Sequence, residues 1–202
     1  MINEMETISI TYRGIVHKLT EYEKLVDTIE MIYTMCDQKI THWGDSITGK
    51  NGGKVKKYKR GKILYNSLKN DNLERVSFFS LPEDFVTAAF DYTIYISINY
   101  KEKYITAVFE KNVLKNEKIE SIKNVLASYM ESPYTEEIYT MDKEETPLLY
   151  AAKINPSSSF KTLRVLSSKT ISEKSNERGA DFKLFKKKKL YWMKKQYIHM
   201  HR

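Results

Sequence analysis

Two hydrophobic periodicities alternate along this chain of 202 residues, and they constrain its fold more than any other feature. Apolar residues two apart, as in Ile8, Ile10 and Tyr12, are typical of a half-buried β-strand. Apolar residues three and four apart, as between Tyr22 and Ile40, are typical of an amphipathic helix. A chain that switches between these two patterns predicts an α+β domain.

The order of the predicted elements favours a mostly antiparallel sheet with two main helices packed on one face. The strand pattern occupies residues 8–13, 73–79, 90–100, 104–109, 135–141 and 148–154. The helix pattern occupies 22–40, behind a capping box of Thr20 and Glu23, and 119–130. Between the first helix and the second strand we expect an irregular loop over 41–58 and a short helix within 59–68, with Ile63, Leu64 and Leu68 facing inward.

The composition changes after Asn155, and we predict an α+β domain over 1–155 and a basic linker and tail over 156–202, with helical spacing near 182–198. Residues 1–150 carry 20 basic and 23 acidic side chains, whereas 151–202 carry 14 and 3. Within the first part, eight basic residues and no acidic one lie between Lys50 and Lys69. An acidic body thus carries two basic segments.

The sequence contains no pattern typical of a disulfide framework, a phosphate-binding loop or a metal site. The one cysteine, Cys36, excludes a disulfide framework, and its helical spacing places it on the buried face of the first helix. The stretch Gly44–Asn51 fits the first part of a P-loop, but it ends in Asn51 where the Mg²⁺-binding hydroxyl belongs. We therefore expect no cofactor and no metal site, although an active site assembled from distant residues stays open as a third hypothesis. The sequence has no apolar run of 18 residues and no signal-peptide pattern at its start, so we expect a cytoplasmic protein.

A protein partner is the first functional hypothesis, because an acidic and aromatic stretch follows the second helix. Such a surface fits a basic partner and speeds its capture. Trp43 is either a lid over the core or a further contact with the partner. The candidate residues are Trp43, Tyr134, Glu136, Glu137, Tyr139, Asp142, Glu144 and Glu145.

Binding of nucleic acid or of another anionic surface is the alternative, through the basic loop and the basic tail. Lysine and arginine neutralise phosphates, and aromatic rings stack on bases. A solvated tail, or a last helix docked on the body, is the competing interpretation of the second segment. The candidate residues are Lys54, Lys56, Lys57, Lys59, Arg60, Lys186, Lys187, Lys188, Lys189 and Trp192.

A first strand, a long amphipathic helix and a Trp-bearing loop that runs into a basic segment, Ile40-Thr41-His42-Trp43-Gly44 to Lys59-Arg60-Gly61-Lys62, resemble the opening of bacterial polymorphic-toxin immunity proteins, in particular the family called immunity protein 52. The resemblance covers residues 8–70, and the first strand lacks the aromatic-Trp-Gly start of that family. It implies a small cytosolic α+β protein without catalytic residues that binds and blocks a toxin made by the same or a neighbouring cell. On this basis the partner is a cognate toxin, and the sequence leaves the oligomeric state undecided.

Overall fold

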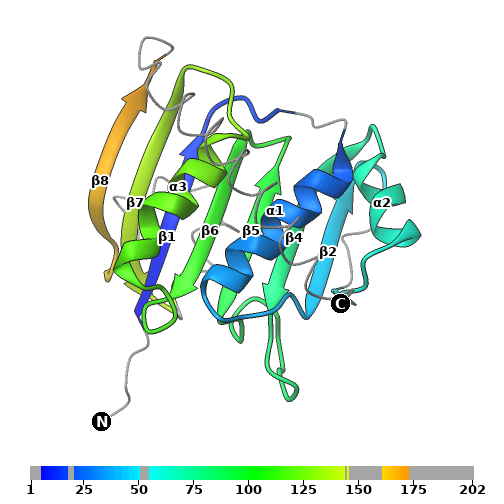
Figure 1. The fold of residues 1–202 in the computed structure, drawn as a ribbon, viewed down its shortest axis with the longest axis horizontal. Helices are drawn as coiled ribbons and strands as arrows, with labels where there is room; N and C mark the ends of the chain where they lie inside the picture. The colour runs from blue at the N-terminus through cyan, green and yellow to red at the C-terminus, as the bar shows by residue number, and fades with distance from the viewer. Residues whose placement is uncertain (1–5, 18–20, 51–54, 144, 146–160, 173–202) are drawn as a thin grey trace, which may run out of the picture.

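An antiparallel sheet of eight strands forms the frame of the structure, with the strand order β3-β2-β4-β5-β6-β1-β7-β8 (Figure 1). The computed structural model describes residues 6–17, 21–50, 55–143, 145 and 161–172. The strands are β1 (Glu6–Arg13), β2 (His42–Ile47), β3 (Lys56–Lys57), β4 (Leu73–Ser80), β5 (Ile94–Asn99), β6 (Tyr104–Glu110), β7 (Tyr134–Asp142) and β8 (Arg164–Ile171).

The helices described lie on one face of this sheet (Figure 1). They are α1 (Tyr22–Met35), α2 (Lys62–Leu68) and α3 (Ile119–Ala127), which follows the 3-10 turn η1 (Asn116–Lys118). The apolar stripe of α1 and that of α3 are buried against the inward-facing residues of the strands, and burial of each large aliphatic side chain contributes about 1.5–3 kcal/mol. The predicted α+β class is thereby confirmed, with a mostly antiparallel sheet and two main helices on one face.

The first helix ends one turn earlier than its apolar spacing predicts. Its last residue is Met35, Cys36 caps it, and Asp37 adopts the left-handed conformation with φ of 55°. The amide of Asp37 donates to the carbonyl of Thr34, and the amide of Gln38 donates to that of Tyr33. This pair of bonds is a Schellman motif, which satisfies the last carbonyls and turns the chain toward β2. At the other end the N-cap is Glu21, and Thr20 of the predicted capping box lies outside the described residues.

The prediction of an irregular loop over 41–58 is wrong, because β2 and β3 form within it. Strand β2 pairs antiparallel with β4, and Trp43, opposite Phe78, faces the core. The inward positions of β2 include Trp43 and Asp45, and Gly44 lies between them. Because Asp45 is charged and Gly44 has no side chain, the sequence lacks the alternation that identifies a strand. The inward position predicted for Ile63 is also wrong, since this residue of α2 is 75% exposed while Leu64 and Leu68 are buried.

Two further boundaries differ from the prediction. Strand β5 begins at Ile94 instead of Phe90, which lies in the loop after β4. Strand β8 comes from residues 164–171 and pairs with β7, so the sheet continues past residue 155. The predicted strand 148–154 and the helical pattern near 182–198 lie outside the described residues.

Candidate protein-binding surfaces

Strand β7 holds most of the predicted partner-binding residues, and its alternation divides them between the two faces of the sheet. Glu136, opposite Tyr12 of β1, lies on the helix face together with Tyr134, whereas Glu137 and Tyr139 lie on the other face. The stretch that reads as one acidic surface in the sequence is therefore not one surface in the structure.

Glu136 is fully buried between β1, α3 and β8. Its Oε2 accepts a hydrogen bond of 2.7 Å from the Tyr12 hydroxyl, and its Oε1 lies 2.8 Å from Lys169 Nζ and 3.2 Å from Lys123 Nζ. Burial by itself raises the pKa of Glu136, but the bonds from Lys169 and Tyr12 and the charge of Lys123 outweigh it and hold that pKa below its ordinary value. This carboxylate is an internal ion-pair partner, out of reach of a docking protein.

The other candidates on β7 also have internal contacts. Tyr139 is buried with its hydroxyl 3.1 Å from that of Thr11, and Glu137 forms an ion pair of 2.8 Å with Arg13. Tyr134 is half-buried and meets the Tyr12 ring edge-on. Asp142 and, after the strand, Glu145 stay partly exposed at one end of the sheet, and Glu144 lies outside the described residues.

Trp43 is a buried member of the main core, as expected of a lid. Lys56 of β3 lies over the indole ring, with its Nζ 4.5 Å from the ring centroid, and also pairs with Asp45 at 2.9 Å. Ser67 of α2 donates to the same carboxylate at 2.6 Å. These contacts join β2, β3 and α2 and cover the tryptophan, so its ring is not presented at the surface.

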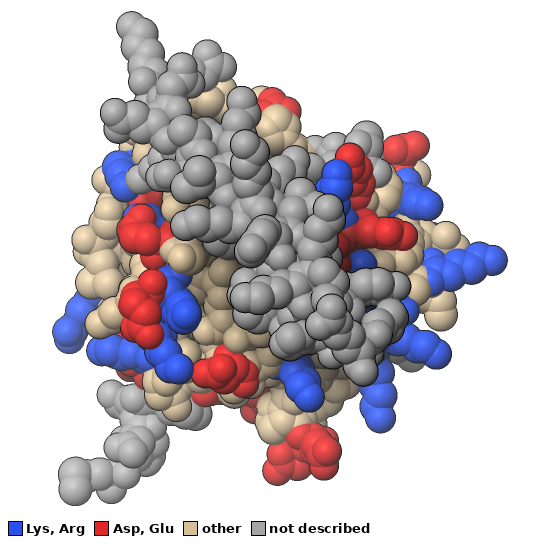
Figure 2. All heavy atoms as spheres, viewed as in Figure 1, with Lys and Arg blue, Asp and Glu red and all other residues tan. Residues whose placement is uncertain are grey.

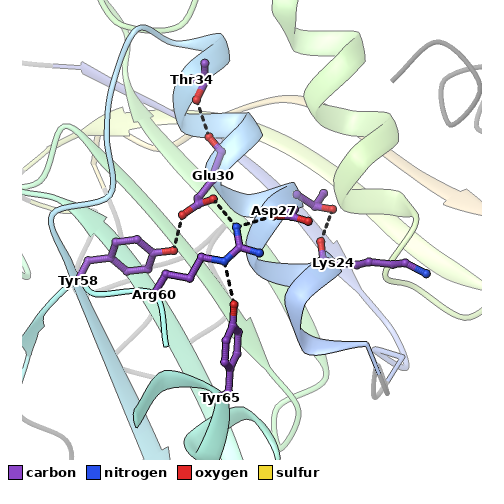
Figure 3. Close-up of polar contacts among 8 residues, drawn as sticks. Lys24, Asp27, Glu30, Thr34, Tyr58, Arg60 and Tyr65 are labelled. Atoms are coloured by element: carbon purple, nitrogen blue, oxygen red, sulfur yellow. Dashed lines mark hydrogen bonds and ion pairs between the residues drawn. The ribbon is translucent and has the colours of Figure 1, made fainter. Parts of the chain in front are cut away.

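The basic segment is partly neutralised by acidic residues of α1. Figure 3 shows the Arg60 guanidinium between α1 and α2. Its Nη1 lies 2.6 Å from Asp27 and 3.3 Å from Glu30 of α1. Its Nε donates to the hydroxyl of Tyr65 in α2 at 2.8 Å. The Tyr58 hydroxyl donates to Glu30 at 2.7 Å, and burial together with that bond raises the pKa of Tyr58. The charge of Arg60 is thus paired within the protein and attaches the basic segment to α1.

Of the other basic candidates, Lys57 and Lys59 point to solvent, and Lys56 is engaged with Asp45. Lys54, Lys186, Lys187, Lys188, Lys189 and Trp192 lie outside the described residues. Cys36 is buried, and burial raises the pKa of its thiol to about 11, as expected of a core cysteine and not of a nucleophile.

Among the described residues, the most exposed large hydrophobic side chain lies where the sequence singled out no site. Val86 is 92% exposed in the loop of residues 81–91, called here the β4–β5 loop, and Phe90 in the same loop is 41% exposed. Glu83 and Asp84 are exposed beside them, and the loop contains no basic residue. Figure 1 shows this loop extending beyond the end of the sheet, and Figure 2 shows acidic side chains at the lower edge of the molecule.

The β4–β5 loop is held in place by its own contacts. The carboxylate of Asp91 accepts the backbone amides of Val86 and Thr87, both at 2.7 Å, and these two bonds lower the pKa of Asp91. The base of the loop packs on the face of the sheet opposite α1, in a small second core to which Leu81, Ala88 and Tyr92 belong. An exposed apolar tip is therefore carried on an ordered base.

A sequence signal for this loop existed in part. Pro82-Glu83-Asp84 is a turn pattern, but the alternation that includes Phe90 assigned this residue to the strand of residues 90–100. Whether an apolar residue in a loop is buried depends on the path of the backbone, which the local pattern does not determine.

Comparison of the chain with protein-family models, with curated proteins and with solved structures found no match. In the part of the chain that the structure describes, no helix is long and apolar enough to cross a membrane. The same residues bring together no group of three or more histidine, cysteine or acidic side chains able to hold a metal ion.

Proposed function

We propose that the chain is a non-enzymatic protein-binding module, and that it is an immunity protein that binds and neutralises a cognate bacterial toxin. The observation that supports binding is the β4–β5 loop, which presents Val86 and Phe90 next to Glu83 and Asp84 on an anchored backbone. The toxin as partner rests on the resemblance of residues 8–70 to immunity proteins.

Order in the loop favours binding because less conformational freedom is lost when a partner docks. An apolar tip with a charged rim also has the anatomy of a protein interface, where the buried centre excludes water and the rim stays polar. Burial of Val86 against a partner would contribute about 1.5–3 kcal/mol, roughly a tenfold to a hundredfold change in affinity.

The charge of the loop indicates the chemistry of the partner. Glu83 and Asp84 carry two exposed negative charges, and Asp142 and Glu145, from the set predicted by the sequence, lie at the same end of the sheet. A basic partner, such as a toxin that acts on nucleic acid, would be steered toward this end.

The test uses the polypeptide encoded beside the gene of this chain, with its C-terminal region as the probe. We expect that region to be toxic when produced alone, and the wild-type chain to restore growth when both are produced. Val86→Asp together with Glu83→Lys should abolish the protection, whereas Ile63→Asp, a change at an exposed aliphatic residue of α2, should leave it intact.

Two results would contradict the proposal. One is full protection by the loop variant, and the other is a neighbouring polypeptide that is neither toxic nor bound. Tight binding of the full chain to duplex DNA that weakens steeply with salt would replace the proposal by the nucleic-acid alternative.

A further inference from the structure

Strand β8 is attached to a body whose core does not need it. Its neighbour β7 also pairs with β1, from Thr135 to Asp142, on the side away from β8. No residue of β8 belongs to a hydrophobic cluster of the described residues, whereas β2, near the other edge of the sheet, contributes Trp43 to the main core. The apolar burial that stabilises the inner strands therefore contributes little to β8.

The side chains of β8 mostly face solvent. Six of its eight residues are exposed, among them Val165 and Leu166 at 56% and 61%. The register with β7 shifts between Ile138 and Tyr139 and leaves Leu166 as an extra residue, so the ladder of backbone bonds is interrupted. A strand with exposed backbone bonds and few buried side chains is typical of an element that opens before the rest of a protein.

An ion pair connects the middle of β8 to the interior. Lys169 and Glu136 are opposite in the register, and Lys169 Nζ lies 2.8 Å from Glu136 Oε1. The carboxylate does not depend on this lysine alone, because the Tyr12 hydroxyl donates to its Oε2 at 2.7 Å and Lys123 Nζ lies 3.2 Å from its Oε1. When β8 leaves, Lys169 becomes hydrated and Glu136 keeps two partners, so no unpaired charge is left in the interior.

We propose that β8 is a releasable strap, which detaches from β7 as a unit while the other strands stay folded. Its release uncovers the outer edge of β7 and the carboxylate of Glu136. The closed form presents the basic residues Arg164 and Lys169 at this edge, and the open form presents a strand that contains Glu136 and Glu137. The strap thus determines whether this edge meets a partner as a basic or as an acidic surface.

Hydrogen exchange measured for single amides tests the release. Successive residues of an inner antiparallel strand bond alternately to one neighbour and to the other, so the amides of β7 form a set bonded to β8 and a set bonded to β1. Release of β8 frees the first set and leaves the second protected. We expect the first set to exchange at least roughly tenfold faster than the second, and with little dependence on urea.

A disulfide between β7 and β8 provides the matched control. Thr135 and Thr170 are opposite in the register, and opposed residues of an antiparallel pair have Cα atoms about 4.5–5.5 Å apart, within the range that a disulfide bridges. In the oxidised variant with Thr135→Cys and Thr170→Cys, the two sets of β7 amides should exchange equally slowly, and reduction should restore the difference. Cys36 is buried and its thiol pKa is raised to about 11, so it should not compete.

A substitution far from the strap separates its release from global unfolding. Leu64 is buried in α2, which lies at the opposite end of the sheet from β8 (Figure 1). Its packing persists while β8 is released and is lost on global unfolding. Leu64→Ala should therefore speed exchange of the set bonded to β1 at least roughly tenfold and leave the set bonded to β8 unchanged.

The proposal does not depend on the toxin-binding function. The Val86→Asp variant, which changes the β4–β5 loop, should release β8 as the wild type does. Loss of toxin protection in that variant therefore leaves the strap untouched, and a strap that fails the exchange experiment leaves the toxin-binding function untouched.

Equal exchange of the two sets of β7 amides in the wild type would overturn the proposal. Fast exchange confined to the two ends of β8 would overturn it as well, because that is fraying and not release of a unit. The same holds if the disulfide leaves the difference between the sets unchanged, or if Leu64→Ala speeds both sets equally, since the strand then opens only with the whole domain.

Discussion

Replacement of Glu136 by glutamine should destabilise the protein far more than replacement of its neighbour Glu137. Glu136 is fully buried, and the side chain of its partner Lys123 is only 7% exposed. Removing one member of a buried ion pair costs about 3–5 kcal/mol, because the other charge is left in the interior. Lys169 is 41% exposed and can turn to water, Lys123 keeps its ion pair with Glu120, and an amide oxygen still accepts from Tyr12. We therefore expect the low end of that range, about 3 kcal/mol, for Glu136→Gln.

Glu137→Gln is the matched control, with the same chemical change one position along the same strand. The Glu137 and Arg13 side chains are 25% and 42% exposed, and such a pair contributes about 0–1 kcal/mol. The measurement is urea denaturation at pH 7, with the free energies compared at equal slope. If Glu136→Gln costs no more than Glu137→Gln, the buried ion-pair cluster does not stabilise the fold and the reasoning is refuted.

The pH dependence of the same difference has a definite sign. The pKa of Glu136 is lower in the folded protein than in the unfolded chain, so its contribution is present above the unfolded carboxyl pKa. That contribution is lost as the pH falls through the folded pKa. The gap between the wild type and Glu136→Gln should accordingly be full at pH 7 and shrink on acidification, and a gap that widens in acid would contradict the assignment.

Three further predictions concern local packing. Gly14→Ala should cost about 1–3 kcal/mol in urea, because Gly14 has φ of +150° and an added Cβ would lie 3.0 Å from the Tyr134 Cβ; Gly44→Ala, with no atom within 4 Å, should be nearly neutral, and equal costs would contradict this. Leu64→Ala should cost about 2–5 kcal/mol by opening a cavity, whereas Ile63→Ala on the exposed side of α2 should cost little, and the reverse order would show that the helix is rotated. Cys36, with its thiol pKa raised to about 11, should react with a thiol reagent at pH 8 only as fast as the protein opens, and fast reaction of the native chain would refute its burial.

The fold class followed from the sequence because the longest elements have clear periodicity. The alternation of Ile8, Ile10 and Tyr12 indicates a strand, and the spacing of Leu25, Ile29 and Ile32 indicates a helix. At these residues the local pattern and the packing of the core favour the same structure. Strand β2 was not predicted because its inward positions include Asp45, whose charge is compensated by Lys56 and Ser67 from other segments of the chain. No local pattern contains that information.

The candidate surface shows the same limit more sharply. Glu136 and Glu137 are indistinguishable in the sequence, yet the pleat places one beneath α3 and the other outside. Val86 belongs to none of the predicted elements, yet the carboxylate of Asp91 accepts its backbone amide and the loop leaves the valine in solvent. Charge and hydropathy identify which residues are available, and the backbone decides which of them reach the surface.

Association kinetics with the toxic region of the neighbouring polypeptide test the central claim most directly. Glu83→Lys with Asp84→Lys, in the β4–β5 loop, should slow association at low salt more than they speed dissociation, because opposite charges steer the encounter. Charge reversal at Glu137, which is paired with Arg13, should change the association rate much less. If the loop variant associates as fast as the wild type while the Glu137 variant is slowed, the β4–β5 loop is not the surface that receives the partner.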